Sequence, residues 1–91
     1  MSKSILQDKK ECWQTGRTEG LHRHHIYYGS GLRRISDKHG FIVWLSPEWH
    51  NQDSRIDIQH NPNCGLDLKL KTECQRKYEE THSREDFLKL I

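Results

Sequence analysis

Cysteine, proline and long apolar stretches are all scarce in this chain of 91 residues. Its cysteines, Cys12, Cys64 and Cys74, are odd in number and form no C-x-x-C pair. Such spacing is not that of a disulfide framework, so we expect a reducing compartment. No segment is long enough for a transmembrane helix, and residues 1–12 lack the apolar core of a signal peptide. These absences predict an intracellular protein that has no membrane partner.

Apolar residues are also few, at 32% of the chain against 31% charged residues. A short chain with so thin a core forms one domain, residues 1–91, and often needs a bound metal or a partner subunit for stability. Three tryptophans and three tyrosines argue against disorder, because each buries a large area. The net charge of +2 is compatible with a polyanionic partner, but it is weaker than that of a dedicated nucleic-acid binder.

Two strands and a loop are predicted in the first half of the chain. Residues 21–28 are rich in β-branched and aromatic side chains, and residues 41–45, "FIVWL", form a short apolar run between Gly40 and Ser46-Pro47. The glycine-rich, basic residues 29–40, "GSGLRRISDKHG", predict a flexible connection between the strands. Residues 1–11 are polar and predict an extended arm.

Three helices are predicted in the second half. Ser46 and Pro47 resemble the start of a short helix, and Asn61 before Pro62 resembles the cap of a long one. Four residues spaced every four positions predict the buried face of the long helix: Leu66, Leu70, Cys74 and Tyr78. Ser83, with an acidic residue three positions later, predicts a capping box for a last helix. That helix is still apolar at residue 91, so we expect the native chain to continue. The class is α+β.

The densest chemical signal is the histidine cluster in "LHRHHIYYGSG", residues 21–31. A metal site needs ligands from separate elements; His50 lies on the short helix and His60 in the loop that follows it. A hairpin with His24 and His25, packed against His50, would combine a metal site with a general base. Imidazole suits zinc and other first-row ions. His22 is expected to support this site or to face solvent.

The segments "LHRHHI", "SD" and "VWLSPEWHN" resemble the ββα-metal (HNH) endonuclease motif over residues 12–61. The likeness is to small phage and prophage proteins related to a recombinase-dependent phage nuclease. It implies a small treble-clef-like hairpin plus helix, with further C-terminal helices in residues 62–91.

The resemblance also implies roles for individual residues. His25 would be the general base, oriented by Asp37 or, failing that, by His39. The ligands of one divalent ion (zinc, nickel, magnesium or manganese, not distinguished) would be His24, His50 and His60. The residues that contact DNA phosphates would be Arg33, Arg34 and Lys38.

The implied function is metal-dependent hydrolysis of DNA with low sequence specificity, in phage or prophage DNA processing or recombination. The implied partners are DNA, a recombinase or a packaging protein such as a terminase, and a second copy of the chain. The implied location is the cytoplasm of a bacterial host. Two alternatives remain open: a catalytically inactive, metal-stabilised nucleic-acid-binding module, and an interaction domain whose histidines bind nothing.

Two features depart from the motif: its mid-loop asparagine is absent, and the ligands of its structural zinc are not kept. Many family members hold a structural zinc with two C-x-x-C pairs, whose four positions here read Cys12, Thr15, Ser46 and Trp49. We expect that zinc to be lost and three tryptophans to pack in its place: Trp13, Trp44 and Trp49. Neighbouring residues of a regular strand also point to opposite faces. His24 and His25 can therefore serve one site only where the strand bends, bulges or ends.

Overall fold

The computed structural model describes residues 3–29 and 31–91, and it confirms the α+β class. Met1 and Ser2 of the predicted arm and Ser30 of the predicted loop lie outside the described residues. In chain order the elements are β1 (His22–His25), α1 (Leu32–His39), β2 (Ile42–Leu45), the π-type helix η1 (Glu48–Gln52), α2 (Gly65–Tyr78) and α3 (Arg84–Leu90). Within the described ranges, no helix is long and apolar enough to cross a membrane.

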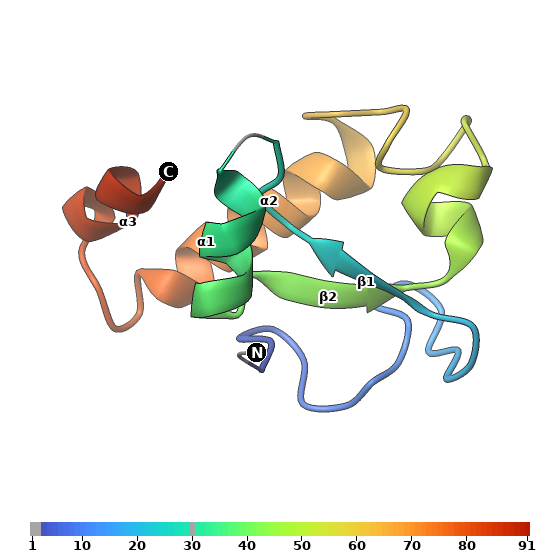
Figure 1. The fold of residues 1–91 in the computed structure, drawn as a ribbon, viewed down its shortest axis with the longest axis horizontal. Helices are drawn as coiled ribbons and strands as arrows, with labels where there is room; N and C mark the ends of the chain where they lie inside the picture. Colours follow the sequence, from blue (N-terminus) through green and yellow to red (C-terminus); the bar gives the residue numbers. More distant parts are fainter. Residues whose placement is uncertain (1–2, 30) are drawn as a thin grey trace.

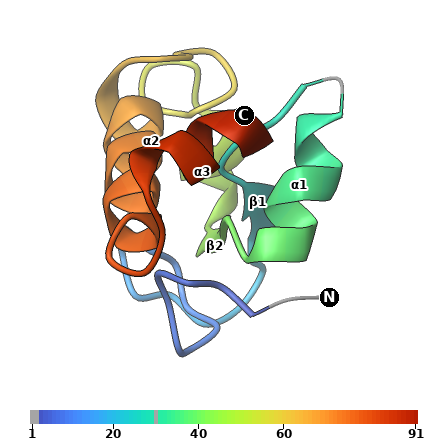
Figure 2. The same ribbon diagram turned by 90° about the vertical axis from the view of Figure 1, so that its left-hand side faces the viewer.

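The centre of the fold is a two-stranded antiparallel sheet, with His22 opposite Leu45 and His25 opposite Ile42. Figures 1 and 2 show α1 and α2 on opposite sides of this hairpin, with α3 beyond the end of α2. The core lies between the sheet and the helices. Its fully buried members come from β2, from α2 and from the segments beside them: Ile26, Phe41, Val43, Leu45, Ile58, Leu70 and Cys74.

The buried face predicted for the long helix is confirmed. Leu66, Leu70 and Cys74 are buried, and Tyr78 packs against the core. The predicted cap at Asn61 is wrong, because α2 begins only at Gly65. The chain turns first at Asn63, which has a positive φ of 60° and whose N–H donates to the Asp67 carboxylate. The predicted capping box of α3 is confirmed: the Ser83 hydroxyl accepts a hydrogen bond from the Asp86 N–H at 3.0 Å.

The flexible connection predicted for residues 29–40 is wrong, since most of it folds as α1. Leu32 and Ile35 pack against the core, and Ser36 between them and the sheet is fully buried. The Ser36 hydroxyl donates to the Tyr27 carbonyl at 2.6 Å and accepts from the Tyr27 N–H at 3.1 Å. These contacts, together with a left-handed Gly40 at the end of the helix, stabilise α1 in place of a loop.

Gly40 provides a stability test. Its φ is +76°, and an added Cβ would meet the backbone oxygen of Lys3. Gly16 has a similar φ of +78° with no atom near its added Cβ, so it is a matched control. We expect Gly16→Ala to cost about 1–2 kcal/mol for the left-handed backbone alone. Gly40→Ala should cost about 1–3 kcal/mol more, because the N-terminal segment must move. Urea denaturation measures both, and equal losses would contradict the close packing of Lys3.

Candidate functional site

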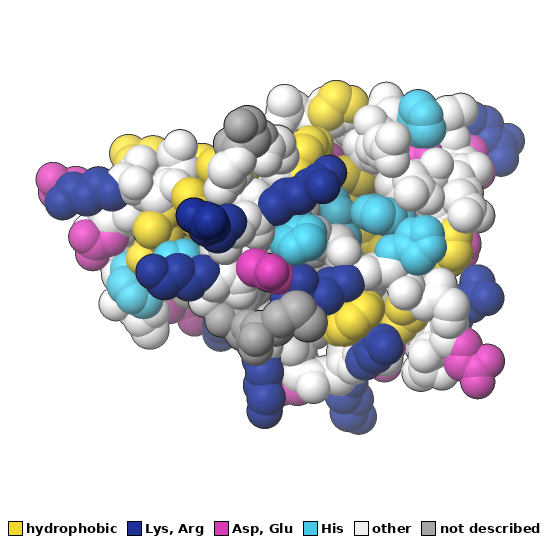
Figure 3. Space-filling model, in the orientation of Figure 1, with side chains coloured by type: hydrophobic (Ala, Val, Ile, Leu, Met, Phe, Trp, Pro, Cys, Tyr) yellow, Lys and Arg dark blue, Asp and Glu magenta, His cyan; other side chains and the backbone are white. Residues whose placement is uncertain are grey.

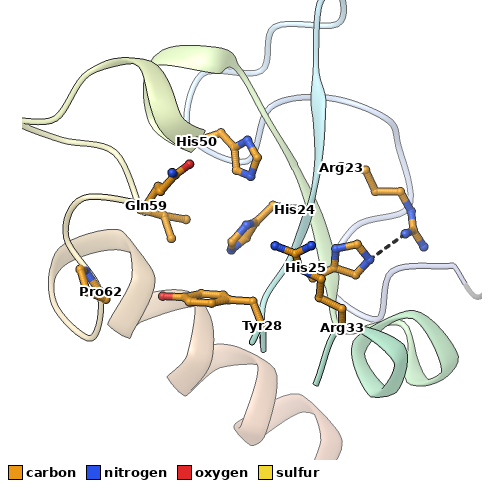
Figure 4. Close-up of a pocket in the computed structure, with 9 residues that line it drawn as sticks. Arg23, His24, His25, Tyr28, Arg33, His50, Gln59 and Pro62 are labelled. Atoms are coloured by element: carbon orange, nitrogen blue, oxygen red, sulfur yellow. Dashed lines mark hydrogen bonds between the residues drawn. The ribbon is translucent and has the colours of Figure 1, made fainter. Parts of the chain in front are cut away.

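A pocket of about 560 Å³ opens where β1 ends (Figure 4). Its walls come from β1, α1, η1 and the loop before α2, and they include Arg23, His24, His25, Tyr28, Arg33 and His50. Figure 3 shows that histidines gather near the middle of this face of the molecule, with Lys and Arg side chains around them. Segments far apart in the sequence therefore meet at one cationic, histidine-rich hollow.

His24 and His25 both line this pocket although they are neighbours in a strand. β1 is four residues long and stops at His25, whereas the sequence predicted a strand that reached residue 28. Because the strand ends there, side chains from both of its faces can reach the open end. This satisfies the geometric condition under which the two histidines can act in one site.

His24 is the buried histidine of the pocket, with 4% of its surface exposed. The pKa of His24 is lowered to about 3, mainly by burial and to a smaller extent by His50, His25 and Lys71. The ring is therefore neutral at physiological pH, which is the form that binds metals. Its Nε2 atom is buried without a hydrogen-bond partner. A buried polar atom without a hydrogen-bond partner destabilises the folded protein, and a bound ion would supply the missing partner.

His50 faces His24 across the pocket, with the ring centroids 5.3 Å apart (Figure 4). It projects from η1, whose first turn forms when the N–H groups of Trp49 and His50 donate to the Ser46 carbonyl. Burial and the nearby His22 lower the pKa of His50, although Asp57 acts in the opposite direction. Two neutral imidazoles from separate elements therefore face each other in one pocket.

His25 lies beside a carboxylate from α1. Its Nε2 is 3.3 Å from Asp37 Oδ1, and the same oxygen bonds to the Arg23 guanidinium. The hydrogen bond from Arg23 is the main reason why the pKa of Asp37 is lowered, so this group stays ionised. Of the two residues predicted to orient His25, the structure brings Asp37 to it. His39 instead stacks on Phe41, at 5.6 Å between ring centroids.

The sequence interpretation gave Arg23 no role. Strand alternation was the available signal, since residues 23 and 25 share a face of β1. Tyr28 was also unassigned. Its ring lies 6.0 Å from that of His24, and its hydroxyl donates to the buried Asp67 carboxylate at 3.1 Å. Asp67 in turn pairs with Lys71 at 3.0 Å. This network fixes the wall of the pocket on the side of α2.

His60, the predicted third ligand, is not brought to His24 and His50. Its Nδ1 is 2.8 Å from an oxygen of the fully buried Asp57 carboxylate, and about half of its side chain (49%) is exposed. In residues 3–29 and 31–91, no group of three or more His, Cys, Asp or Glu side chains is arranged to hold a metal ion.

The three basic residues predicted to contact phosphates occupy different positions. Arg33 lines the pocket, and its guanidinium extends toward the space between His24 and His25 (Figure 4). Arg34 and Lys38 are exposed on the same helix but lie outside the pocket lining. The structure therefore separates Arg33 from Arg34 and Lys38.

Three of the four positions that hold zinc in many HNH proteins meet here, and Cys12 is the one zinc-ligand type among them. The Cys12 thiol lies 3.3 Å from the Ser46 hydroxyl, and Thr15 also bonds to it. Burial raises the pKa of Cys12, but the hydrogen bonds outweigh burial and bring it to about 7. Trp13 and Trp49 pack against the core, whereas Trp44 lies under the Lys10 ammonium, 4.5 Å from its ring centroid.

Comparisons of the chain with protein-family models, with curated proteins and with solved structures give no match.

Proposed function

We propose that the chain is a metal-dependent endonuclease of the HNH type, which hydrolyses DNA phosphodiester bonds with low sequence specificity. One observation carries the proposal: His24, whose Nε2 atom has no partner and whose ring lies 5.3 Å from that of His50, shares a pocket with a histidine paired with a carboxylate. A hairpin followed by a helix that presents His50 to the strand is also what the ββα-metal motif would require.

His24 and His50 would hold the ion through neutral imidazoles, which suit zinc and nickel better than manganese and magnesium, because the latter two ions favour oxygen ligands. When bound, a divalent ion stabilises the negative charge on the phosphoryl and leaving oxygens. The role of the chain is to hold both rings at the pocket and to keep them unprotonated. Burial of His24 and His50 does the latter.

His25 would act as the general base. The Nε2 atom of His25 lies 3.3 Å from Asp37 Oδ1, which can only accept, and 3.3 Å from the Arg23 guanidinium, which can only donate. The proposal requires the tautomer in which Nε2–H donates to the ionised Asp37. The Nδ1 atom is then free to take a proton from the attacking water. Asp37 also stabilises the imidazolium that results. General-base assistance of this kind contributes roughly 10²–10⁴-fold to the rate.

The test is nicking of supercoiled plasmid by the purified protein, with magnesium, manganese, nickel and zinc titrated separately. We expect relaxation that depends on the added metal and stops when a chelator is present. Relaxation that is indifferent to the chelator would contradict the proposal. Metal binding without cleavage would favour the alternative of an inactive, metal-stabilised nucleic-acid-binding module.

Arg33 would contact the phosphate beside the cut, because it is the α1 arginine that lines the pocket. We expect Arg33→Gln to lower the rate of nicking by about tenfold, the loss of one charge-assisted hydrogen bond of roughly 1.5 kcal/mol. Arg34→Gln removes the same charge from the adjacent exposed position and is the matched control. Equal losses in the two variants would mean that α1 attracts DNA only through its overall charge.

The biological setting follows from the sequence resemblance alone. We infer a phage or prophage protein that acts on DNA in recombination or packaging, with a recombinase or a packaging protein as a partner. One pocket cuts one strand, so a double-strand break would require two copies or two events.

A further inference from the structure

The contact between His22 and His50 has no role in the proposed chemistry so far. His22 is two residues before His24 in β1, and its Nδ1 lies 2.8 Å from the Nδ1 of His50. The rings meet edge to face, with centroids 4.9 Å apart and an interplanar angle of 84°. One proton must lie between two ring nitrogens at this distance, so one ring donates it and the other accepts it.

We propose that His22 is a positioning residue: its Nδ1 accepts the Nδ1–H of His50, so that His50 presents a free Nε2 lone pair to a metal ion. This inference rests on the proposed metal site and assigns that site its supporting contact. His22 itself is not a ligand. It acts on the ion only through the ring of His50.

The chemistry of imidazole sets the direction of the hydrogen bond. A neutral ring carries one proton, so a His50 that binds metal through Nε2 must carry that proton on Nδ1. That Nδ1–H then needs an acceptor, and His22 Nδ1 is the atom within reach at 2.8 Å. If His22 donated instead, His50 would carry its proton on Nε2 and could not coordinate through that atom.

The position of the two rings supports the same assignment. His24 and His50 face each other across the pocket, and the Nε2 of His24 has no partner. An ion bound by His24 Nε2 and by the second nitrogen of His50 would leave the contact with His22 intact. Metal-binding histidines generally donate their other N–H to a fixed acceptor, and loss of that acceptor costs roughly 10–100-fold in metal affinity.

The experiment measures metal affinity without DNA, by competition of the purified full chain with a chromophoric chelator for nickel and for zinc. The key pair of variants is His22→Asn and His22→Gln. Asparagine places its amide oxygen near the position of Nδ1 and can accept the bond, whereas the longer glutamine places it elsewhere. His82→Asn changes an exposed histidine that stacks on Tyr78, and it controls for the number of histidines. Near-UV circular dichroism checks the fold of each variant.

We expect His22→Asn and His82→Asn to bind within about threefold of the wild type, and His22→Gln to bind roughly 10–100-fold more weakly. Wild-type affinity in both His22 variants would overturn the inference and leave the proposed function standing. An equal loss in both would make His22 a ligand and also overturn it. Tighter metal binding in both His22 variants would mean that His22 competes with the ion for the Nδ1 atom of His50, which would also overturn the inference. Absence of metal binding in the wild type would overturn the metal site itself.

Discussion

Replacing His25 by alanine should lower the rate of metal-dependent plasmid nicking by about 10²–10⁴-fold. The reason is local: His25 is the pocket histidine paired with a carboxylate, through a 3.3 Å contact between its Nε2 and Asp37. Its side chain is not a proposed ligand, so metal affinity should change little. The measurement is the initial rate of conversion of supercoiled to relaxed plasmid at saturating metal.

His39→Ala is the control for this variant. His39 is at the end of the same helix that carries Asp37, but its ring stacks on Phe41. We expect its nicking rate to remain close to that of the wild type. Nicking that survives His25→Ala would indicate a contaminating nuclease or a different base, and His22 and His24 would then be the candidates. A loss accompanied by a loss of bound metal would make His25 a ligand instead.

His24 should make the metal-free protein markedly less stable in mild acid. Its folded pKa of about 3 lies below the ordinary value of 6.5, mainly because the ring is buried. Below pH 6.5 the unfolded chain takes up a proton on this residue and the folded chain does not. The stabilisation is therefore complete above pH 6.5 and declines as the pH falls toward 3. The loss should reach about 2 kcal/mol between pH 6.5 and pH 5, at about 1.4 kcal/mol per unit.

Urea denaturation at a series of pH values, with a chelator present, measures this effect. The comparison variant is His24→Gln, which cannot titrate, so its stability should fall by about 2 kcal/mol less over the same range. His82→Gln makes the same substitution at an exposed histidine and is the matched control. Parallel pH profiles for wild type and His24→Gln would show that His24 is protonated in the folded protein.

The elements found from the sequence were those with a strong local pattern. The apolar run at residues 41–45, the four-residue spacing of α2 and the capping box at Ser83 each depend on neighbours in the chain, and each predicted element is present. α1 was missed because two glycines and several charges hid its short apolar face. The contacts of Ser36 with the Tyr27 backbone stabilise it, and no local pattern shows them.

The candidate site was predictable to a similar extent. The histidine cluster on the first predicted strand and the histidine on the short helix were enough to predict that His24, His25 and His50 lie together, as they do in the pocket. The roles of His22 and Arg23 depend on strand register and on where α1 places Asp37, so they became visible only in three dimensions. The same applies to His60, since the sequence gives no sign that a buried Asp57 occupies its Nδ1.

The four residues of β1 alternate between two groups of contacts. His22 and His24 meet His50, while Arg23 and His25 meet Asp37. A deletion or insertion of one residue in this strand would exchange the two sets between faces, because side chains alternate with a period of two. A single substitution in β1 therefore affects one of these two groups of contacts, whereas a shift of one residue in the strand register would disrupt both. Libraries that vary this protein should keep the length of residues 22–25 constant.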